Sequence, residues 1–500
     1  MYDLANITST QTITGQTSSK TLFIGADKKP ITAHQWLAQV SLIRQQLQQM
    51  PQQTWLLYHG DIVAFSQGFF ALLLAGKRIV LPPSDKPEQL KAIVHSSNQS
   101  SSTNSNQSIA PIEAILGSAT VEGLTKLTLQ TSDVRSKSVE VDSVEADSVE
   151  VDSAKGKQHS LSQSPSQLIA AQTKIDFFTS GSTGAAKRVT KSWRQLATEV
   201  QDLESLWGDA LGQSQIINSV SHQHVYGLLF GLLWPLLNQR VINTTFIHYP
   251  ENLEQQLALL EDQQQLCLVA SPALLTRTFD LPLWQHHQAK LIQVFSSGGP
   301  LPLQAATAIL PQPIEVFGST ETGGIAWRKQ GQNIHWQPFA SVKCKLDDHS
   351  QRLMLQSPYL PEQFTPDGDH WYLCDDTVTF DENGHFKLLG RADRIVKIEE
   401  KRLSLDELEQ ALLHHQWISQ CRAVVLPGLR VQVAMVVVLT AKGQAELDEH
   451  GKRQMGQQLR LNLSERFEAI LLPRKWRYVP QMPQNHQGKL INQQLLALFE

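Results

Sequence analysis

A lysine preceded by hydroxyl-bearing residues and glycines forms the segment with the clearest chemical potential in the chain. It follows an apolar run at 174–178 and reads Thr179-Ser180-Gly181-Ser182-Thr183-Gly184-Ala185-Ala186-Lys187. Glycines let successive backbone N–H groups converge on an anion, hydroxyls add donors, and a lysine supplies positive charge. The spacing matches neither a Walker loop nor a G-x-G-x-x-G loop. We expect a phosphate-binding loop; the alternative is an ordinary surface loop, which Ser/Thr/Gly runs more often form.

Further along the chain, short motifs combine glycines with aromatic, acidic or basic residues. They are Phe317-Gly318-Ser319-Thr320-Glu321, Trp371-Tyr372-Leu373-Cys374-Asp375-Asp376, Gly390-Arg391-Ala392-Asp393 followed by Lys397, and Gln487-Gly488-Lys489-Leu490. Taken singly, such an aromatic residue is usually part of a core, and such acids and lysines are usually solvated. Only the ordered set of motifs therefore supports a functional interpretation.

A histidine and a glycine complete the candidates. His224 lies between polar residues and the apolar stretch that begins at Val225. A histidine in such surroundings is as often a satisfied structural group as a functional one, and we favour His224 over His222 as the functional residue. Gly298 lies in Ser297-Gly298-Gly299-Pro300, where a missing Cβ allows the backbone to approach a ligand closely.

The chain around these motifs has the pattern of an α/β protein. Apolar strand-like runs alternate with helical patterns, as at 174–178 followed by 193–207. After Gly390 the pattern changes to an acidic helix at 405–414, a strand at 431–440 and a long helix at 451–469. We therefore predict a large α/β domain at 1–391, with mixed sheets and helices, and a small α+β domain at 392–500.

Residues 96–167 interrupt this pattern with Ser, Asn, Gln and acidic residues, including the near-repeat SVEVD-SVEAD-SVEVD at 138–152. Such a composition buries too little apolar surface to offset the entropy of the chain. We predict a disordered surface insertion with little function, in which the less polar stretch 112–129 keeps some local structure. The alternation of Val with acids leaves open a short solvated strand or helix.

The bulk composition excludes several classes of function. The 500 residues are 41% hydrophobic and carry 43 basic and 47 acidic side chains, so no basic footprint indicates nucleic-acid binding. The four cysteines contain no C-x-x-C pair, which fits neither a zinc site nor a dense disulfide framework. The N-terminal residues lack a signal pattern, and the apolar run at 225–237 is shorter than the roughly 20 residues of a spanning helix. We expect a cytoplasmic protein without a membrane span.

In their order and spacing, the motifs resemble the signatures of the adenylate-forming (AMP-binding) superfamily. This superfamily contains acyl-CoA synthetases, aryl-CoA ligases, luciferases and the adenylation domains of non-ribosomal peptide synthetases. The resemblance extends from about Ile31 to Leu496, apart from the insertion. It implies a large ATP-binding domain, a small mobile C-terminal domain, and an enzyme that activates a carboxylic acid with ATP and Mg²⁺.

The resemblance implies phosphate-side roles for four elements. The loop from Thr179 to Lys187 would hold the β and γ phosphates of ATP, Thr320 would touch the α-phosphate, and Glu321 would bind Mg²⁺. Negative charge would then be neutralised on both sides of the phosphorus atom that the substrate carboxylate attacks.

It also implies nucleoside-side roles. Phe317, followed by Gly318, would stack on adenine; Asp376 would accept hydrogen bonds from both ribose hydroxyls, and Arg391 would belong to the same nucleotide site. Gly298 would approach the nucleotide and the acid through its backbone.

Three further residues would act in catalysis or in motion. Lys489 would bring positive charge to the carboxylate and the α-phosphate in the transition state, and His224 would cover the carboxylate end of the acyl pocket. Asp393 matches the hinge about which the small domain of this superfamily rotates between its two half-reactions.

The sequence departs from the superfamily pattern at three positions. Ala186 replaces a common proline, Asp375 replaces a glycine, and Glu400 stands where relatives carry the glycine that borders the thiol tunnel. An acidic side chain at that border would crowd, repel or redirect a thiol carrier. Adenylation is therefore better supported than thioester formation.

Our interpretation is an acid ligase that forms an acyl-AMP and then a thioester with coenzyme A or the phosphopantetheine of an acyl carrier protein. The sequence leaves the acid open, since either a fatty or an aromatic acid is compatible with it. Two alternatives remain: an adenylating enzyme that forms no thioester, and an inactive binding protein on the same scaffold.

Overall fold

The computed structural model describes residues 20–25, 29–99, 111–121, 123–129, 169–180, 186–260, 264–287, 289–364, 371–398, 401–426, 432–484, 490 and 492–500. The chain divides into two compact units. Unit 1 contains Met1–Val269 and Ala289–Ile292, and unit 2 contains Ala270–Gln288 and Gln293–Glu500. The predicted domain boundary at 391/392 falls inside unit 2 and stays a prediction.

Unit 1 contains a six-stranded sheet with the strand order β6-β5-β3-β4-β7-β8. Its neighbouring strands are parallel except for β7 and β8, which form an antiparallel hairpin. Helix α2 is almost entirely apolar and buried, and it packs against β3, β4 and β5. The bounds are β3 (Thr54–Tyr58), α2 (Ile62–Leu74), β4 (Arg78–Leu81), α3 (Pro87–Gln99), β5 (Ala114–Gly117), β6 (Thr125–Leu127), β7 (Lys174–Ser180) and β8 (Ala186–Ser192).

Within the predicted insertion at 96–167, residues 96–99 belong to α3, which contradicts the disorder expected there, whereas residues 111–121 and 123–129 have the local structure expected of the less polar stretch 112–129. They contain β5 and β6, and β5 lies between β3 and β6 in the sheet. Ala114, Ile115 and Leu116 are 0% exposed, because a parallel strand inside a sheet needs apolar side chains on both faces. The sequence marked this stretch as less polar than its surroundings but did not indicate its place inside the sheet. The near-repeat at 138–152 lies outside the described residues.

Unit 1 also contains five strands of a nine-stranded sheet, except for the last residue of β11. Their order is β11-β9-β10-β1-β2. Between β9 and β10 the chain forms a helix whose middle part, η3, is a π-helix. The bounds are β1 (Thr21–Ile24), β2 (Pro30–Thr32), α1 (Ala33–Gln49), α4 (Trp193–Leu211), β9 (Gln215–Asn218), α5 (Val225–Leu228), η3 (Leu229–Leu233), α6 (Trp234–Leu237), β10 (Ile242–Phe246), α7 (Pro250–Ala258) and β11 (Leu266–Ala270).

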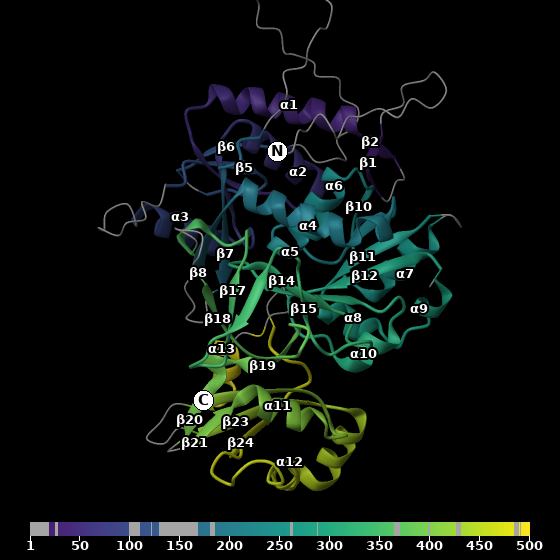
Figure 1. Ribbon diagram of the computed structural model, residues 1–500, viewed down its shortest axis with the longest axis vertical. Coiled ribbons are helices and arrows are strands. Elements are labelled where there is room, and N and C mark those ends of the chain that lie inside the picture. Colours follow the sequence, from purple (N-terminus) through teal and green to yellow (C-terminus); the bar gives the residue numbers. More distant parts are fainter. Residues whose placement is uncertain are drawn as a thin grey trace, which may run out of the picture. The chain divides into compact units, whose positions relative to one another are not determined.

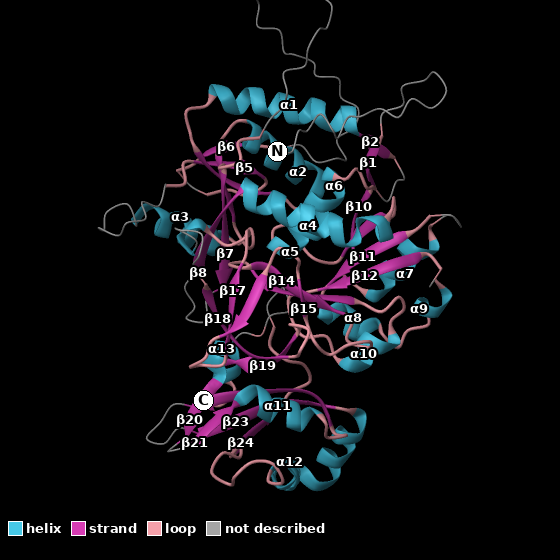
Figure 2. Cartoon of the chain, viewed as in Figure 1, coloured by secondary structure: helices cyan, strands magenta, loops and turns pink. Residues whose placement is uncertain are grey.

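The other four strands of that sheet, in the order β15-β14-β13-β12, belong mainly to unit 2, which adds a four-stranded antiparallel sheet, β16-β17-β18-β19. From β13 to β19, strands greatly outnumber helices (Figure 2). The bounds are α8 (Pro272–Thr278), α9 (Leu283–His286), β12 (Leu291–Ser296), α10 (Leu303–Ala308), β13 (Ile314–Ser319), β14 (Gly323–Arg328), β15 (Gln337–Pro338), β16 (Lys343–Leu346), β17 (Arg352–Gln356), η4 (Glu362–Phe364), β18 (Tyr372–Phe380) and β19 (Phe386–Arg391).

The segment after β19, which we call the C-terminal module (392–500), combines helices with a two-stranded and a three-stranded sheet (Figure 1). Two clusters of apolar side chains form its cores, and all their members lie between 396 and 499. This supports the predicted small α+β domain. The bounds are η5 (Ala392–Arg394), β20 (Ile395–Ile398), β21 (Lys401–Ser404), α11 (Leu405–Leu413), β22 (Ile418–Leu426), β23 (Gln432–Leu439), α12 (Ala441–Leu463), β24 (Lys475–Tyr478) and α13 (Asn492–Ala497).

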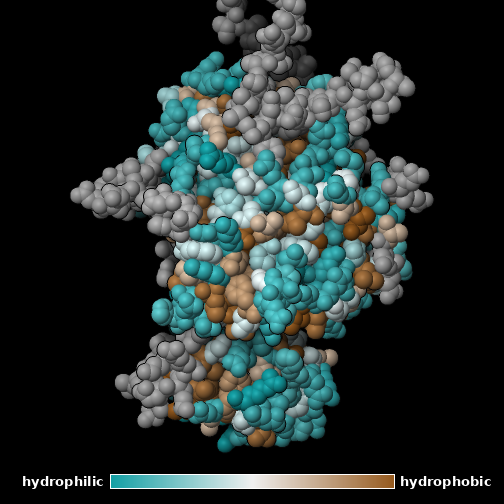
Figure 3. All heavy atoms as spheres, viewed as in Figure 1, coloured by the Kyte–Doolittle hydropathy of each residue, from teal (hydrophilic) through white to brown (hydrophobic). Residues whose placement is uncertain are grey.

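Polar residues dominate the visible surface. On the face in Figure 3, hydrophobic residues lie in separate areas among hydrophilic ones, as on most folded proteins. Among the helices that the structure describes, none combines the length and the apolar character needed to cross a bilayer.

Strand β5 gives a direct test of the structure found inside the predicted insertion. Replacing Ile115, which is 0% exposed, by Ala should lower the free energy of unfolding by about 3 kcal/mol, because it leaves a cavity in the sheet core. Denaturant unfolding measures the change, and Thr125→Ala on the exposed part of β6 is the matched control. A cost for Ile115→Ala no larger than that of the control would remove β5 from the cooperative core.

Candidate active site

The predicted phosphate loop is bounded by the hairpin of β7 and β8. The backbone pairing of this hairpin extends to Thr179 opposite Lys187 and Ser180 opposite Ala186. The side chains of 179–187 lie outside what the structure describes, so the roles expected of Ser182, Thr183, Gly184 and Lys187 stay predictions. The hairpin nevertheless fixes both ends of the loop.

A buried carboxylate anchors that hairpin. Asp176 on β7 is 0% exposed and accepts two hydrogen bonds from Arg78 on β4, at 2.7 and 2.9 Å. It also pairs with Arg188 and accepts a hydrogen bond from the Thr190 hydroxyl on β8. Burial acts to raise the pKa of Asp176, but the bonds and charges of the two guanidinium groups outweigh it and hold the pKa below its ordinary value. The carboxylate of Asp176 therefore links β4, β7 and β8 at the base of the predicted phosphate loop.

The aromatic-Gly-Ser-Thr-Glu motif forms the tight connection between β13 and β14. Gly318 pairs with Gly324 there, and a Cβ on Gly318 would lie 2.2 Å from the carbonyl oxygen of Gly323. Only glycine fits such an approach. The Thr322 hydroxyl accepts a hydrogen bond from the Ser319 N–H at 3.0 Å, and the Ser319 hydroxyl accepts one from the Thr322 N–H at 3.1 Å. Thr320 and Glu321, between these residues, are therefore held on a fixed turn.

Phe317 rests on an aromatic base. Its ring centroid lies 5.5 Å from that of Trp336 and 6.0 Å from that of Phe386. The guanidinium of Arg328 lies 4.3 Å from the Trp336 centroid, and it donates two hydrogen bonds of 3.1 Å to the buried Glu315. Phe317 itself is only partly buried. It is therefore packed into the structure on one side and keeps ring surface on which a base can stack.

Glu321 can serve as a magnesium ligand. Mg²⁺ usually keeps several waters and takes one or two carboxylates plus substrate phosphates, and the partly exposed Glu321 fits such a site. Burial, followed by negative charges that include Glu321, raises the pKa of Tyr372 to about 12. The charge of Glu321 therefore acts on β18. Among the described residues, no group of three or more His, Cys, Asp or Glu could form a metal site made by the protein alone.

Asp376 and Arg391 lie opposite each other at the end of the β18–β19 pair. The neighbouring Asp375, which stands where the superfamily has glycine, accepts a hydrogen bond of 2.6 Å from Arg352 and lies 3.5 Å from Arg391. Arg352 and Arg391 thus offset the additional negative charge of Asp375. Because Phe386 on the same strand contacts Phe317, unit 2 brings the predicted adenine, ribose and magnesium residues together on adjoining elements.

His224 is at the N-cap position of α5 and is partly buried. Its neighbour His222 is buried, with its Nε2 2.8 Å from the carbonyl oxygen of His59. A carbonyl oxygen can only accept, so this nitrogen carries the proton. Burial disfavours the charged ring and lowers the pKa of His222 to about 4. This structural role of His222 agrees with our choice of His224 as the functional candidate. His224 belongs to unit 1 and the predicted nucleotide residues belong to unit 2, so the catalytic role of His224 stays a prediction.

Gly298 follows β12 with a φ of +95° and is exposed. This is the left-handed region that favours glycine. The backbone turns here as the sequence predicts, and the expected contact with the nucleotide stays a prediction.

The hinge candidate Asp393 lies in the short 3-10 helix η5. The side chains of Asp393 and Lys397 lie outside the described part of the structure, as do all atoms of Glu400 and Lys489. The next residue, Arg394, pairs with Asp406 and Glu409 on α11. These two acids are recognisable in the sequence only as charges in the first two turns of the acidic helix, which does not reveal their partners.

Solved structures of low sequence identity share this fold. ATP-bound MatB from Rhodopseudomonas palustris matches with a TM-score of 0.74 at 15% identity, covering 99% of each chain. The amide bond synthetase McbA from Marinactinospora thermotolerans matches with a TM-score of 0.69 at 16% identity, again covering 99% of each chain. The chain therefore has the fold of the adenylate-forming enzymes.

Sequence comparison carries this further. The family model described as AMP-binding enzyme matches residues 103–353, half of the chain. The chain therefore belongs to the AMP-binding enzyme family. A 4-coumarate–CoA ligase of Cereibacter sphaeroides is 24% identical over 331 residues, which cover 65% of this chain and 71% of the relative. An acetyl-coenzyme A synthetase of Nitrosomonas europaea is 22% identical over 312 residues, which cover 46% of that relative, and a probable CoA ligase of Humulus lupulus is 23% identical over 363 residues, which cover 62% of it.

The burial of His222 predicts a pH dependence of stability. The unfolded ring titrates at 6.5 and the folded ring at about 4, so the unfolded state alone gains a proton as the pH falls between these values. The free energy of unfolding should therefore decrease through this window, by up to about 3 kcal/mol from this group.

Denaturant unfolding at pH 7.5 and pH 5 measures the effect. His222→Gln, which keeps an N–H donor, should lose much of this dependence, whereas the exposed His349→Gln should keep it. Equal pH dependence in the wild type and His222→Gln would show that His222 is not held neutral by the fold.

Proposed function

We propose that the protein is an ATP-dependent, AMP-forming acid ligase. An oxygen of the substrate carboxylate attacks the α-phosphorus of ATP, the bond to the bridging oxygen breaks, and pyrophosphate leaves. A thiolate then attacks the carbonyl carbon of the acyl-AMP, and AMP leaves as the thioester forms. One observation supports this proposal above the others. In a chain of the AMP-binding family, Phe317, the turn at Glu321 and the edge formed by β18 and β19 lie on adjoining elements.

The described residues suit the nucleotide half of this chemistry. Phe317, backed by Trp336, offers a ring for adenine, and Asp376 offers a carboxylate that can accept two ribose hydroxyls at once. Thr320 supplies a hydroxyl on the same turn as Glu321. Mg²⁺ bound by Glu321 and the phosphates of ATP would offset the charge that develops on the departing pyrophosphate. The loop at 179–187 stays the predicted phosphate-binding element.

The acid and the acyl acceptor are the finer parts of the proposal. We propose a medium-chain fatty or an aromatic carboxylic acid; relatives named 4-coumarate–CoA ligase and anthranilate–CoA ligase support the aromatic choice. The acceptor would be coenzyme A or the phosphopantetheine of an acyl carrier protein. A second candidate is an adenylating enzyme that passes the acyl group to an amine, because Glu400 replaces the glycine at the thiol border and an amide bond synthetase shares the fold.

A panel of carboxylic acids tests the proposal. Purified protein is mixed with ATP, Mg²⁺ and each acid, and the release of pyrophosphate is followed with and without coenzyme A. Acid-dependent release in both arms with acyl-CoA only in the second supports the ligase. Release without any acyl-CoA would exclude coenzyme A as the acceptor and leave a carrier-protein phosphopantetheine or an amine, and no release with any acid would overturn the adenylating function and favour a binding protein.

Lys489→Ala should lower the rate of adenylate formation by roughly two to three orders of magnitude and leave ATP binding nearly intact. The reason is the loss of one cationic contact that stabilises the developing charge in the transition state. Single-turnover pyrophosphate release measures the rate, and Lys475→Ala on the exposed surface of β24 is the control. A Lys489→Ala variant with a rate near that of the wild type would rule out the catalytic role.

Asp393→Pro should keep much of the rate of adenylate formation but lose most of the thioester formation. Proline fixes φ near about −65°, which would trap one state of a hinge that must serve two half-reactions. Asp393→Ala, which leaves φ free, is the matched control. The two half-reactions are measured separately in single turnovers, and equal losses in both would indicate general destabilisation instead of a hinge.

A further inference from the structure

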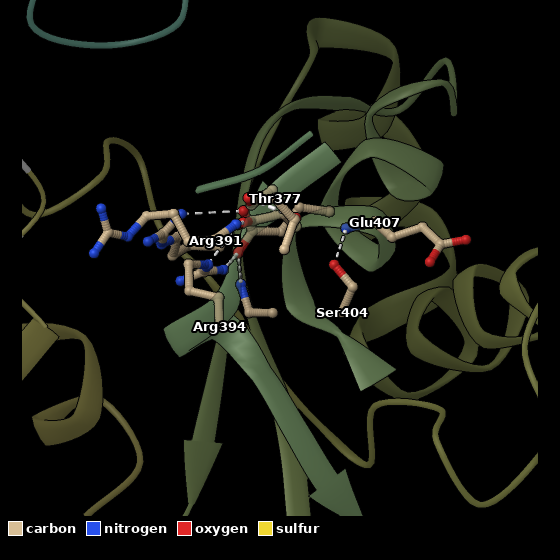
Figure 4. Close-up of polar contacts among 10 residues, drawn as sticks. Thr377, Arg391, Arg394, Ser404 and Glu407 are labelled. Carbon is tan, nitrogen blue, oxygen red and sulfur yellow. Dashed lines mark hydrogen bonds and ion pairs between the residues drawn. The ribbon is translucent and has the colours of Figure 1, made fainter. Parts of the chain in front are cut away.

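The side chain of Asp406 contacts Arg391, which ends β19, and Arg394, which ends the 3-10 turn η5 at the start of the C-terminal module. Its Oδ2 accepts a hydrogen bond from the backbone N–H of Arg391 at 2.9 Å, and its Oδ1 pairs with the guanidinium of Arg394. Figure 4 shows Arg391, Arg394 and Thr377 close to one another, with dashed lines for the polar contacts among the residues drawn. One carboxylate thus joins the last residue of the sheet to the module that follows it.

Local structure fixes where this carboxylate points. Asp406 is in the first turn of α11, whose N-cap Ser404 accepts a hydrogen bond from the Glu407 N–H at 3.2 Å (Figure 4). A helix N-terminus favours a negative charge at this position. Gly390 has a φ of +132°, and a Cβ there would lie 2.9 Å from Oδ2 of Asp406. The glycine therefore makes room for the carboxylate to reach the Arg391 backbone.

The contacted backbone belongs to the predicted nucleotide site. Arg391 lies opposite Asp376 in the β18–β19 ladder, and the Thr377 hydroxyl donates a hydrogen bond of 2.9 Å to the Gly390 carbonyl oxygen. The position of the Arg391 main chain therefore determines how β19 ends beside Asp376. A group that holds this main chain also holds the edge on which ribose would bind.

A second acid on α11 gives an internal contrast. Glu409 is 8% exposed; it pairs with Arg394 and Arg422 and accepts a hydrogen bond from the Ala423 N–H at 2.7 Å. These partners all lie within the C-terminal module. Glu409 and Asp406 share Arg394, but Asp406 in addition contacts the strand that ends at Arg391.

We propose that Asp406 is a positioning residue for nucleotide binding: by holding Arg391 and Arg394 across the turn, it sets the β19 end against Asp376 before ATP arrives. The proposal rests on the proposed function only in naming ATP as the ligand. It predicts a loss of ATP affinity without a matching loss in the chemical step, because Asp406 contacts the backbone that carries the site and not the reacting atoms.

The experiment compares Asp406→Ala with Glu409→Gln in the full chain. Asp406→Ala should raise the KM for ATP about 10-fold, the usual loss for one charge-assisted hydrogen bond, while kcat for adenylate formation changes less than about 2-fold. Amide hydrogen exchange at Arg391 should accelerate. Asp406→Asn, which keeps an acceptor oxygen, should fall between Asp406→Ala and the wild type. Glu409→Gln should lower the melting temperature but leave the KM for ATP and the Arg391 exchange unchanged.

Two results would overturn the proposal. One is an unchanged KM for ATP in both Asp406 variants; the other is a rise in KM for Glu409→Gln as large as that for Asp406→Ala, which would indicate a general effect of α11. If Asp406→Ala fails to fold, the same measurements on Asp406→Asn test the proposal. Direct titration of ATP binding and the exchange of the Arg391 amide need no turnover. Absence of pyrophosphate release in the wild type would therefore count against the proposed function alone.

Discussion

The predicted nucleotide site depends on the close approach of two backbones where β13 meets β14. Gly318 faces the carbonyl of Gly323 at a distance that leaves no space for a side chain. This approach closes the hairpin so tightly that Ser319 and Thr322 can bond to each other's backbone. A hydroxyl and a carboxylate are thereby presented on a turn that has almost no freedom left, so little entropy remains to be lost when a charged ligand binds.

Phe317, which precedes that turn, is held by a series of contacts that begins at the buried carboxylate of Glu315. Glu315 fixes Arg328, Arg328 lies over the ring of Trp336, and Trp336 supports Phe317. In unit 1 the buried Asp176 does comparable work for the hairpin of β7 and β8. In both units a carboxylate removed from water is matched by guanidinium groups, which makes the arrangement costly to disturb and specific in geometry.

The local parts of this architecture could be predicted from the sequence, and the long-range parts could not. The glycine positions, the strand-to-loop order and the separate C-terminal core follow from short motifs and from hydrophobic periodicity. The pairing of Arg78 with Asp176 joins residues 98 positions apart, and that of Arg352 with Asp375 depends on strand register, so neither leaves a local signal. Local structure was expected at 112–129, but four apolar residues inside a polar stretch did not indicate that β5 is a buried strand between β3 and β6. The two acids of α11 were visible as charges, but their partners were not.

The π-helical segment Leu229–Leu233, which follows His224 by a few residues, bears on how this fold can change in evolution. A π-turn holds more residues per hydrogen-bonded ring than an α-turn, and here Gly231 in that turn lies against Asn218. Loss of a single residue from the segment would restore a regular α-helix. The extra residue lies within the π-turn, so its loss would change the local hydrogen-bonded ring and leave α5 and α6 as the flanking α-helices. Tyr226 and Trp234, which both contact the ring of Phe230, lie on either side of this turn. One codon in this segment could therefore alter the contact of Gly231 with Asn218 while the sheets stay as they are.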